Sequence, residues 1–400
     1  MLDLKLRAEF LQEEMRDTAI EFRRYDKTGA LDISPDKFFK ITYPSIDLQK
    51  ALTAIDEKTK GRPIVLLGER GRGKSHIMAA LHHAFISPSI VEQWAQGWID
   101  RSAAEILNDL HLRHGYKPIT VNLNDHNYPV LWNVLFEQHP SGERFRGRFE
   151  SLQQNVPPKQ LIVEMLEKQP IALLLDELQT WYDGTSDQPG NSGPKYRSWA
   201  FSFLQILSEI AGEYPELLIL IVSVRNTNTE AYAQLHRNHP LLIDFLAPTA
   251  RLDRQRLILH RLFENRLFIP ISEIHAITAT YRQERFRLIR SYQDASSEQA
   301  SDQEVMEAWP FSPELLDVLE DQILPSSQAQ GLRDLIRILA LIYRCSITQL
   351  PLFTPADFTV DDKKNDAVKS LINALADSGQ FKLYDVAVSN LKAVQQAGIA

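Results

Sequence analysis

The stretch that decides the fold of this sequence is Gly68-Glu69-Arg70-Gly71-Arg72-Gly73-Lys74-Ser75. It matches the pattern G-x-x-x-x-G-K-[ST], whose glycines let the backbone curl until its N–H groups point at phosphate oxygens. An apolar run at residues 63–67 precedes the stretch and a helical pattern follows from Lys74, which is the context that the pattern requires. The start of the helix adds its positive dipole end, so the whole stretch is predicted to bind a nucleoside triphosphate.

Two acidic residues, Asp176 and Glu177, directly follow another apolar run at residues 171–175. Ligands of open α/β sheets bind beside the carboxyl ends of the strands, so both acids are expected near the phosphate-binding stretch. Ser75 and Asp176 are predicted to bind Mg²⁺, and Lys74 to contact the β- and γ-phosphates. Glu177 is predicted to activate the attacking water as a general base. Alone, an Asp-Glu pair at a strand end is more typical of a solvated turn, but the phosphate-binding stretch favours the catalytic interpretation.

Short apolar runs predict the strands of one sheet, at residues 63–67, 119–123, 171–175 and 217–224. These runs are almost continuously apolar, and segments with helical patterns lie between them. Both features favour a mostly parallel sheet with helices on both faces. The fold class predicted is therefore α/β, with a mainly helical lid region after the sheet.

Changes in composition and in the apolar pattern along the chain predict where its domains begin and end. The expected parts are an N-terminal helical segment at 1–60, an α/β core at 61–250, a helical extension with a polar linker at 251–304, and a helical lid and C-terminal region at 305–400. A charged helix is expected over residues 2–25, and the linker is the run rich in Ser, Gln, Asp and Ala at residues 293–304.

Composition excludes several classes of protein. The 400 residues are 44% apolar and 24% charged, which is typical of globular proteins and excludes collagen, coiled coil and wholesale disorder. No apolar run reaches the roughly 18 residues of a membrane span, and the start lacks the apolar stretch of a signal peptide. The single cysteine, Cys345, cannot form an internal disulfide, and the net charge of −8 does not favour a surface coated in basic charge. A cytoplasmic protein without membrane contact is expected.

The phosphate-binding stretch followed by the acidic pair resembles the additional-strand class of P-loop NTPases, and more narrowly the AAA+ ATPases. In that class a further strand separates the two motifs and ends in a polar sensor. The resemblance implies Ser223 as this sensor, with Asn226 as second choice. It also implies that Arg333 reaches the γ-phosphate from a helical lid and that Arg251 acts on a neighbouring subunit. Ordinary strand-end or exposed helical positions are the alternatives for all four residues.

Looser features resemble the large ATPases of BREX/Pgl-type bacterial phage-defence systems. They are residues 38–45, the Gly-Lys-Ser-His run that ends at His76, and residues 309–316. This resemblance adds His76 to the predicted nucleotide-binding residues, with packing as the alternative. It implies an ATP-driven subunit of a DNA-targeting defence machine that assembles with itself or with other subunits. Those relatives are much longer, so this chain is expected to be an N-terminal piece.

Basic residues are clustered at two places in the sequence, and such clusters can bind nucleic acid. Residues 143–149 interleave arginine with phenylalanine, a mixture that can grip single strands; these residues are Arg144, Phe145, Arg146, Arg148 and Phe149. A second cluster consists of Arg282, Arg285, Arg287 and Arg290. Because the chain is acidic overall, solvated charged faces are the favoured alternative, and direct nucleic-acid contact stays open.

The function predicted is Mg²⁺-dependent binding and hydrolysis of ATP coupled to conformational change, as a subunit of an anti-phage defence complex acting on DNA. Two alternatives remain open. One is a nucleotide-dependent switch or scaffold with little turnover, and the other is an AAA+ factor like those that load helicases or transposases. ATP rather than GTP follows from the family resemblance, since the sequence has no guanine-specific Asn-Lys-x-Asp run.

Overall fold

The computed structural model describes residues 4–11, 29–68, 73–99, 104–125, 128–187, 195–237, 239–245, 250–290, 298–323, 332–346 and 352–355. The chain divides into two compact units, one of Ile20–Ala250 and the other of Met1–Ala19 together with Arg251–Ala400. Each unit has a buried apolar core of its own.

The first unit is built on a parallel sheet, for which the described residues supply five strands in the order β2-β3-β4-β1-β5. These strands are β1 (Ile64–Leu67), β2 (Lys117–Asn122), β3 (Ile171–Asp176), β4 (Leu218–Val224) and β5 (Leu241–Asp244). β4 pairs with both β1 and β3, so a further strand separates the phosphate-loop strand from the acidic strand. The predicted parallel sheet is confirmed, and its order is the one expected of the additional-strand class.

Every residue of β1, β3 and β4 is buried, which explains why these strands are apolar without alternation.

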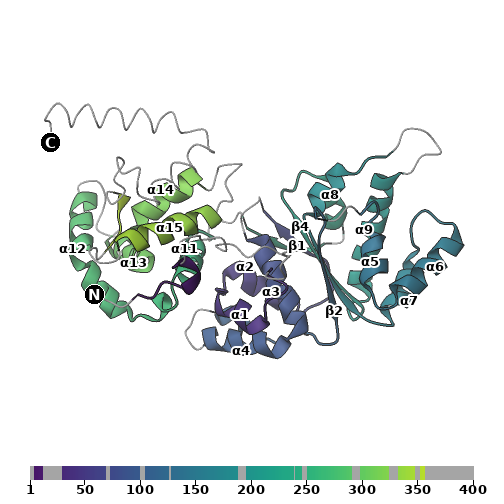
Figure 1. The fold of residues 1–400 in the computed structure, drawn as a ribbon, viewed down its shortest axis with the longest axis horizontal. Coiled ribbons are helices and arrows are strands. Elements are labelled where there is room, and N and C mark those ends of the chain that lie inside the picture. Colours follow the sequence, from purple (N-terminus) through teal and green to yellow (C-terminus); the bar gives the residue numbers. More distant parts are fainter. Residues whose placement is uncertain are drawn as a thin grey trace. The chain divides into compact units, whose positions relative to one another are not determined.

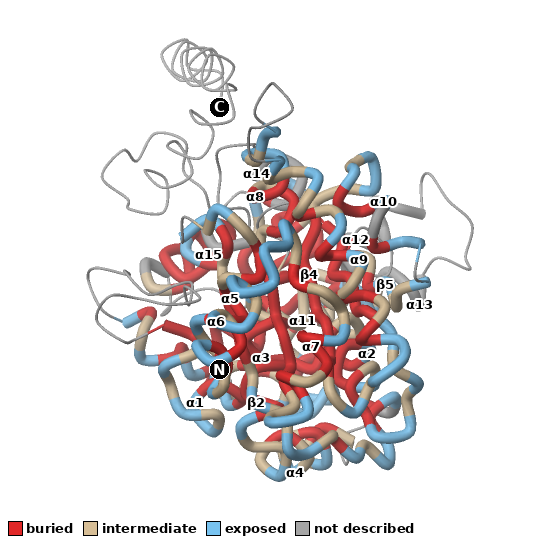
Figure 2. The backbone as a smooth tube through the Cα atoms, turned by 90° about the vertical axis from the view of Figure 1, so that its right-hand side faces the viewer, coloured by how far each residue is buried: buried red, intermediate tan, exposed pale blue. Residues whose placement is uncertain are grey.

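Helices cover both faces of the sheet, as predicted (Figure 1). One face carries α1 (Pro35–Lys40), α2 (Ile46–Ala54), α3 (Lys74–Ile86) and α4 (Pro88–Ile99). The other carries α5 (Trp132–Gln138), α6 (Gly142–Leu152), α7 (Lys159–Leu166), α8 (Leu178–Gly184) and α9 (Tyr196–Glu213). The short helix α10 (Glu230–His236) packs against α8 and α9. Figure 2 shows the buried residues concentrated along the strands and the inner sides of these helices.

The predicted N-terminal segment 1–60 is not one part of the molecule. Residues 29–60 pack onto the sheet unit, where α2 contacts α3 and the His83 ring bonds the Ala30 carbonyl at 2.7 Å. Burial lowers the pKa of His83, so this ring is a neutral packing group. Residues 4–11 belong to the other unit, and they form the 3-10 helix η1 (Ala8–Phe10) instead of the start of a long helix. Their apolar side chains, such as Phe10, are buried in that unit's core, and this burial decides where the segment lies.

The second unit is helical, as predicted for residues beyond 250. Its longer helices are α11 (Ala250–Leu262), α12 (Ile271–Arg290), α13 (Glu298–Ala308), α14 (Pro313–Ile323) and α15 (Leu332–Ser346). The predicted boundary at 304/305 is wrong because it falls inside α13, which also takes up residues 298–304 of the predicted linker. An ion pair between Arg282 and Asp302 joins α12 to α13, and Val305 is fully buried. None of the helices among the described residues has the length and apolarity needed to cross a membrane.

A buried arginine fixes the end of α13. The Arg266 guanidinium donates to the carbonyls of Met306, Glu307 and Trp309, which are groups that a helix end leaves without intrahelical partners. Burial lowers the pKa of Arg266 to about 10. The helical unit is therefore held by polar contacts as well as by its apolar core.

Two glycines of α6, in the sheet unit, provide a matched test of how this helix packs against α5. A Cβ at Gly142 would lie 2.2 Å from the Phe136 carbonyl oxygen, whereas no described atom lies within 4 Å of a Cβ at Gly147. Gly142→Ala is expected to lower the free energy of unfolding by about 1–3 kcal/mol, because the obstacle is backbone. Gly147→Ala is expected to raise it by about 0.5–1 kcal/mol, since alanine loses less backbone freedom in a helix. Urea unfolding of both variants checks this pair, and a stabilising Gly142→Ala would contradict the packing described.

Candidate functional site

The phosphate-binding stretch runs between β1 and α3. Gly73 precedes α3 with a φ of 97°, a left-handed conformation that glycine adopts without steric cost. Gly68 follows β1, and a Cβ there would lie 2.9 Å from Cβ of Phe245. The four predicted nucleotide-binding residues between them lie outside the described residues; they are Glu69, Arg70, Gly71 and Arg72.

Lys74 begins α3 and is buried, with 5% of its surface exposed. Its Nζ donates to the Gly68 carbonyl at 2.5 Å, so the ammonium group lies next to the first residue of the phosphate-binding stretch. A buried positive charge at a helix N-terminus attracts an anion strongly, because little water screens it.

The structure brings this stretch and the acidic strand together. Ser75 Oγ donates to Asp176 Oδ2 at 2.7 Å, across 101 positions of sequence. Asp176 ends β3 with 2% of its surface exposed, and its Oδ1 accepts from Ser223 Oγ at 2.5 Å and from the Glu177 N–H at 3.0 Å. Groups from α3, from β4 and from the end of β3 thus converge on one carboxylate at the carboxyl edge of the sheet.

The donor set at Ser75 and Asp176 fits Mg²⁺. The Asp176 carboxylate is buried and accepts hydrogen bonds from two hydroxyls and one amide. A bound cation would offset its buried negative charge. Hydroxyl and carboxylate oxygens are ligands that Mg²⁺ prefers. The described residues include no cluster of three or more His, Cys, Asp or Glu suited to a metal.

Ser223, the predicted sensor, lies at this edge of the sheet near the end of β4. It is 1% exposed, donates to Asp176, and accepts from the Glu177 N–H at 2.9 Å. A serine hydroxyl carries one proton, which here is directed at Asp176. Ser223 therefore braces the two acids. The alternative sensor, Asn226, lies in the local turn after β4, where its Oδ1 accepts from the Asn228 N–H at 3.1 Å.

Glu177 has an unusual backbone for a residue with a side chain. Its φ of 57° and ψ of 33° are left-handed, and such strain is often found at functional sites. Its Oε2 accepts from Thr180 Oγ1 at 2.7 Å and from Arg225 Nη2 at 2.9 Å. The sequence interpretation did not include Arg225, although it follows β4 directly and therefore lies at the edge where Ser223 and Asn226 were sought.

The remaining predicted site residues lie elsewhere or are not placed. The His76 ring stacks on Phe38, with ring centroids 4.7 Å apart, and its Nε2 lies 3.1 Å from Thr42 Oγ1. This places His76 against α1 and supports the packing alternative. Arg251 and Arg333 have helical backbones in α11 and α15, but their side chains lie outside the described residues and both belong to the other unit.

The arginine-phenylalanine run at 143–149 is the amphipathic helix α6. Phe145 is 2% exposed and the Phe149 ring packs against the core, so neither ring is presented for base stacking. Arg148 pairs with Glu164 at 2.8 Å. In the second basic cluster, Arg282 is 7% exposed and pairs with Asp302, while the other three side chains lie outside the described residues.

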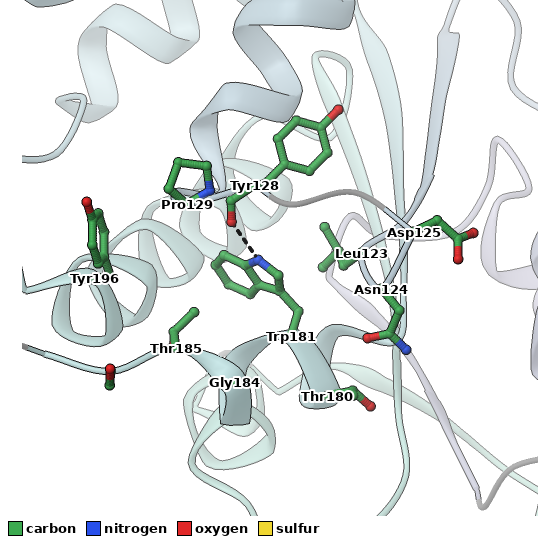
Figure 3. Close-up of a pocket in the computed structure, with 11 residues that line it drawn as sticks. Leu123, Asn124, Asp125, Tyr128, Pro129, Thr180, Trp181, Gly184, Thr185 and Tyr196 are labelled. Carbon is green, nitrogen blue, oxygen red and sulfur yellow. Dashed lines mark hydrogen bonds between the residues drawn. The ribbon is translucent and has the colours of Figure 1, made fainter.

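A pocket of about 600 Å³ adjoins the acidic edge, between the segment after β2 and the helix α8 (Figure 3). The Trp181 indole lines the pocket and donates to the Tyr128 carbonyl at 2.9 Å. Thr180 lines the pocket and also donates to Glu177. The lining of the pocket therefore includes a side chain that bonds the predicted general base.

No protein-family model matches this sequence, and no curated protein matches it. Among solved structures, PCH-2 from C. elegans aligns with a TM-score of 0.26 and 12% identity, over 82% of this chain and 65% of that chain. The replication initiator DnaA, in a structure bound to AMPPCP and single-stranded DNA, aligns with a TM-score of 0.30 and 12% identity, over 94% of each chain. The sheet order and the side-chain contacts at the carboxyl edge carry the functional interpretation.

Proposed function

We propose that this chain binds ATP with Mg²⁺ at the carboxyl edge of its sheet and hydrolyses it. The observation that carries the proposal is the hydrogen bond of 2.7 Å from Ser75 to Asp176. It joins a complete phosphate-binding sequence to an acidic strand that lies two places away in the sheet. A kinase of small molecules would not need the second acid, Glu177, whereas a hydrolase does.

In the proposed reaction, the backbone of residues 68–75 and the Lys74 ammonium hold the β- and γ-phosphates. Ser75 and Asp176 would hold Mg²⁺, which when bound offsets negative charge on the phosphate oxygens. Glu177 accepts a proton from the attacking water while the water oxygen forms a bond to the γ-phosphorus. The bond from that phosphorus to the bridging oxygen breaks, which gives ADP and inorganic phosphate.

We further propose that this reaction drives a conformational change of the helical unit. In this proposal Arg333 contacts the γ-phosphate from the helical lid, and Arg251 acts on an adjacent subunit. Loss of the γ-phosphate would then release the lid arginine. Membership of a cytoplasmic anti-phage defence complex, with DNA contact directly or through partners, is proposed from the sequence resemblance alone.

Release of phosphate by the purified chain, measured over a range of Mg²⁺ concentrations, tests this proposal. We expect hydrolysis that requires Mg²⁺, and Ser75→Ala should raise the Mg²⁺ concentration for half-maximal activity by at least about tenfold. Ser202→Ala is the matched control, because that residue is exposed and its hydroxyl donates to the Ser198 carbonyl within α9. Binding of ATP without hydrolysis at any Mg²⁺ concentration would contradict the proposal and identify a nucleotide switch.

A further inference from the structure

Arg225 is the first residue after β4 and lies beside the predicted general base. Its backbone N–H donates to Gln179 Oε1 at 2.9 Å, which ties the end of β4 to the first turn of α8. Its Nη2 donates to Glu177 Oε2 at 2.9 Å and to Thr180 Oγ1 at 2.5 Å. Thr180 Oγ1 in turn donates to the same Glu177 oxygen, so the three groups form a closed triangle.

The pair of Arg225 and Glu177 differs from an ordinary surface ion pair. Their side chains are 26% and 16% exposed, so water screens the two charges only in part. Within the described chain, the Nε of Arg225 is buried and has no hydrogen-bond partner. Leaving an N–H group unpaired is unfavourable, and such exceptions in folded proteins call for an explanation. The guanidinium uses Nη2 to bond Glu177 and Thr180.

Hydrogen bonds therefore fix both the backbone and the side-chain carboxylate of Glu177. Its amide donates to Asp176 and Ser223, which holds the left-handed backbone at the strand end. Its carboxylate receives two donors on one oxygen, from Thr180 and Arg225. A general base is effective when its orientation is set before the substrate arrives, because no free energy is then spent on orienting it during the reaction.

We propose that Arg225 is the positioning residue for Glu177 in ATP hydrolysis, with Thr180 as its partner. By anchoring Oε2, the two side chains turn the carboxylate so that it presents one fixed edge to the attacking water. Arg225 itself acts through Glu177 and takes no proton. This inference rests on the proposed ATPase function, since it assigns a role only in the hydrolytic step.

The test is a comparison of kcat and KM for ATP. Arg225→Ala is expected to lower kcat about ten- to a hundredfold while KM changes by less than about twofold, because positioning acts on the chemical step. Arg225→Lys should recover part of the loss, since it restores a cation that can reach Oε2. Thr180→Val, which keeps the shape of the side chain, should lower kcat by a smaller factor. The matched control is Arg197→Ala, which breaks an ion pair of 3.0 Å with Glu230 outside the triangle.

A double-mutant cycle separates positioning from other roles. In a Glu177→Gln background, Arg225→Ala is expected to have almost no further effect on kcat, because the base it positions is already lost. Equal effects in both backgrounds would overturn the inference, as would an Arg225→Ala enzyme with unchanged or higher kcat. If Arg225→Ala does not fold, Thr180→Val takes its place in the cycle, with the same expected outcomes. A wild-type chain without turnover would refute the proposed function and this inference with it. An active wild type with insensitive variants would refute the inference alone.

Discussion

Lys74→Ala is expected to reduce ATP hydrolysis at least about a hundredfold and to weaken ATP binding strongly. The ammonium group lies buried within the phosphate-binding stretch, 2.5 Å from the Gly68 carbonyl, where its charge acts on phosphate with little screening. Loss of one such charged donor removes about 3–4 kcal/mol of stabilisation from a phosphoryl-transfer transition state. Titration with a fluorescent ATP analogue and phosphate-release kinetics measure the two effects separately.

A second lysine serves as the control for this variant. Lys58 forms an ion pair of 2.5 Å with Asp109, but the two side chains are 59% and 71% exposed. Lys58→Ala should therefore leave binding, hydrolysis and melting temperature nearly unchanged. Because Lys74 is buried, thermal melting must show that Lys74→Ala is folded before its activity is interpreted. A folded Lys74→Ala chain that hydrolyses ATP at the wild-type rate would remove the phosphate-binding assignment.

Glu177→Gln is expected to lower kcat by about 10²- to 10⁴-fold while ATP still binds. The amide oxygen of glutamine can accept the hydrogen bonds from Thr180 and Arg225, so the local geometry is largely kept. Glutamine cannot take a proton from water, which removes the general base. Single-turnover phosphate release, with ATP binding measured on the same sample, checks both halves of the prediction.

Glu230→Gln is the matched control, because Glu230 also pairs with an arginine, Arg197, but outside the acidic edge. That variant should keep the wild-type kcat. If Glu177→Gln and the wild type hydrolyse ATP equally fast, then Glu177 is not the base and the role proposed for Arg225 has no basis. The lysine and glutamate variants together separate nucleotide binding from the chemical step.

Local patterns in the sequence were sufficient to predict four of the sheet strands and to place the acidic pair at a strand end. They failed for β5, because its apolar run of Leu241, Leu242 and Ile243 is only three residues long, which is too short to identify a strand. They also suggested exposed aromatic rings at 143–149, where the helix turns Phe145 inward. An amphipathic helix of arginine and phenylalanine has the same sequence pattern whether its rings bind a base or a core.

Short-range patterns alone thus assign a phosphate-binding turn and two acids to strand ends, because backbone geometry and burial act over a few neighbouring residues. What those groups contact depends on how distant parts of the chain come together. The bonds from Ser75 to Asp176 and from Arg225 to Glu177 cross 101 and 48 positions of the chain. They exist because β4 lies between β1 and β3, and the pairing of these parallel strands sets the side chains at their ends side by side.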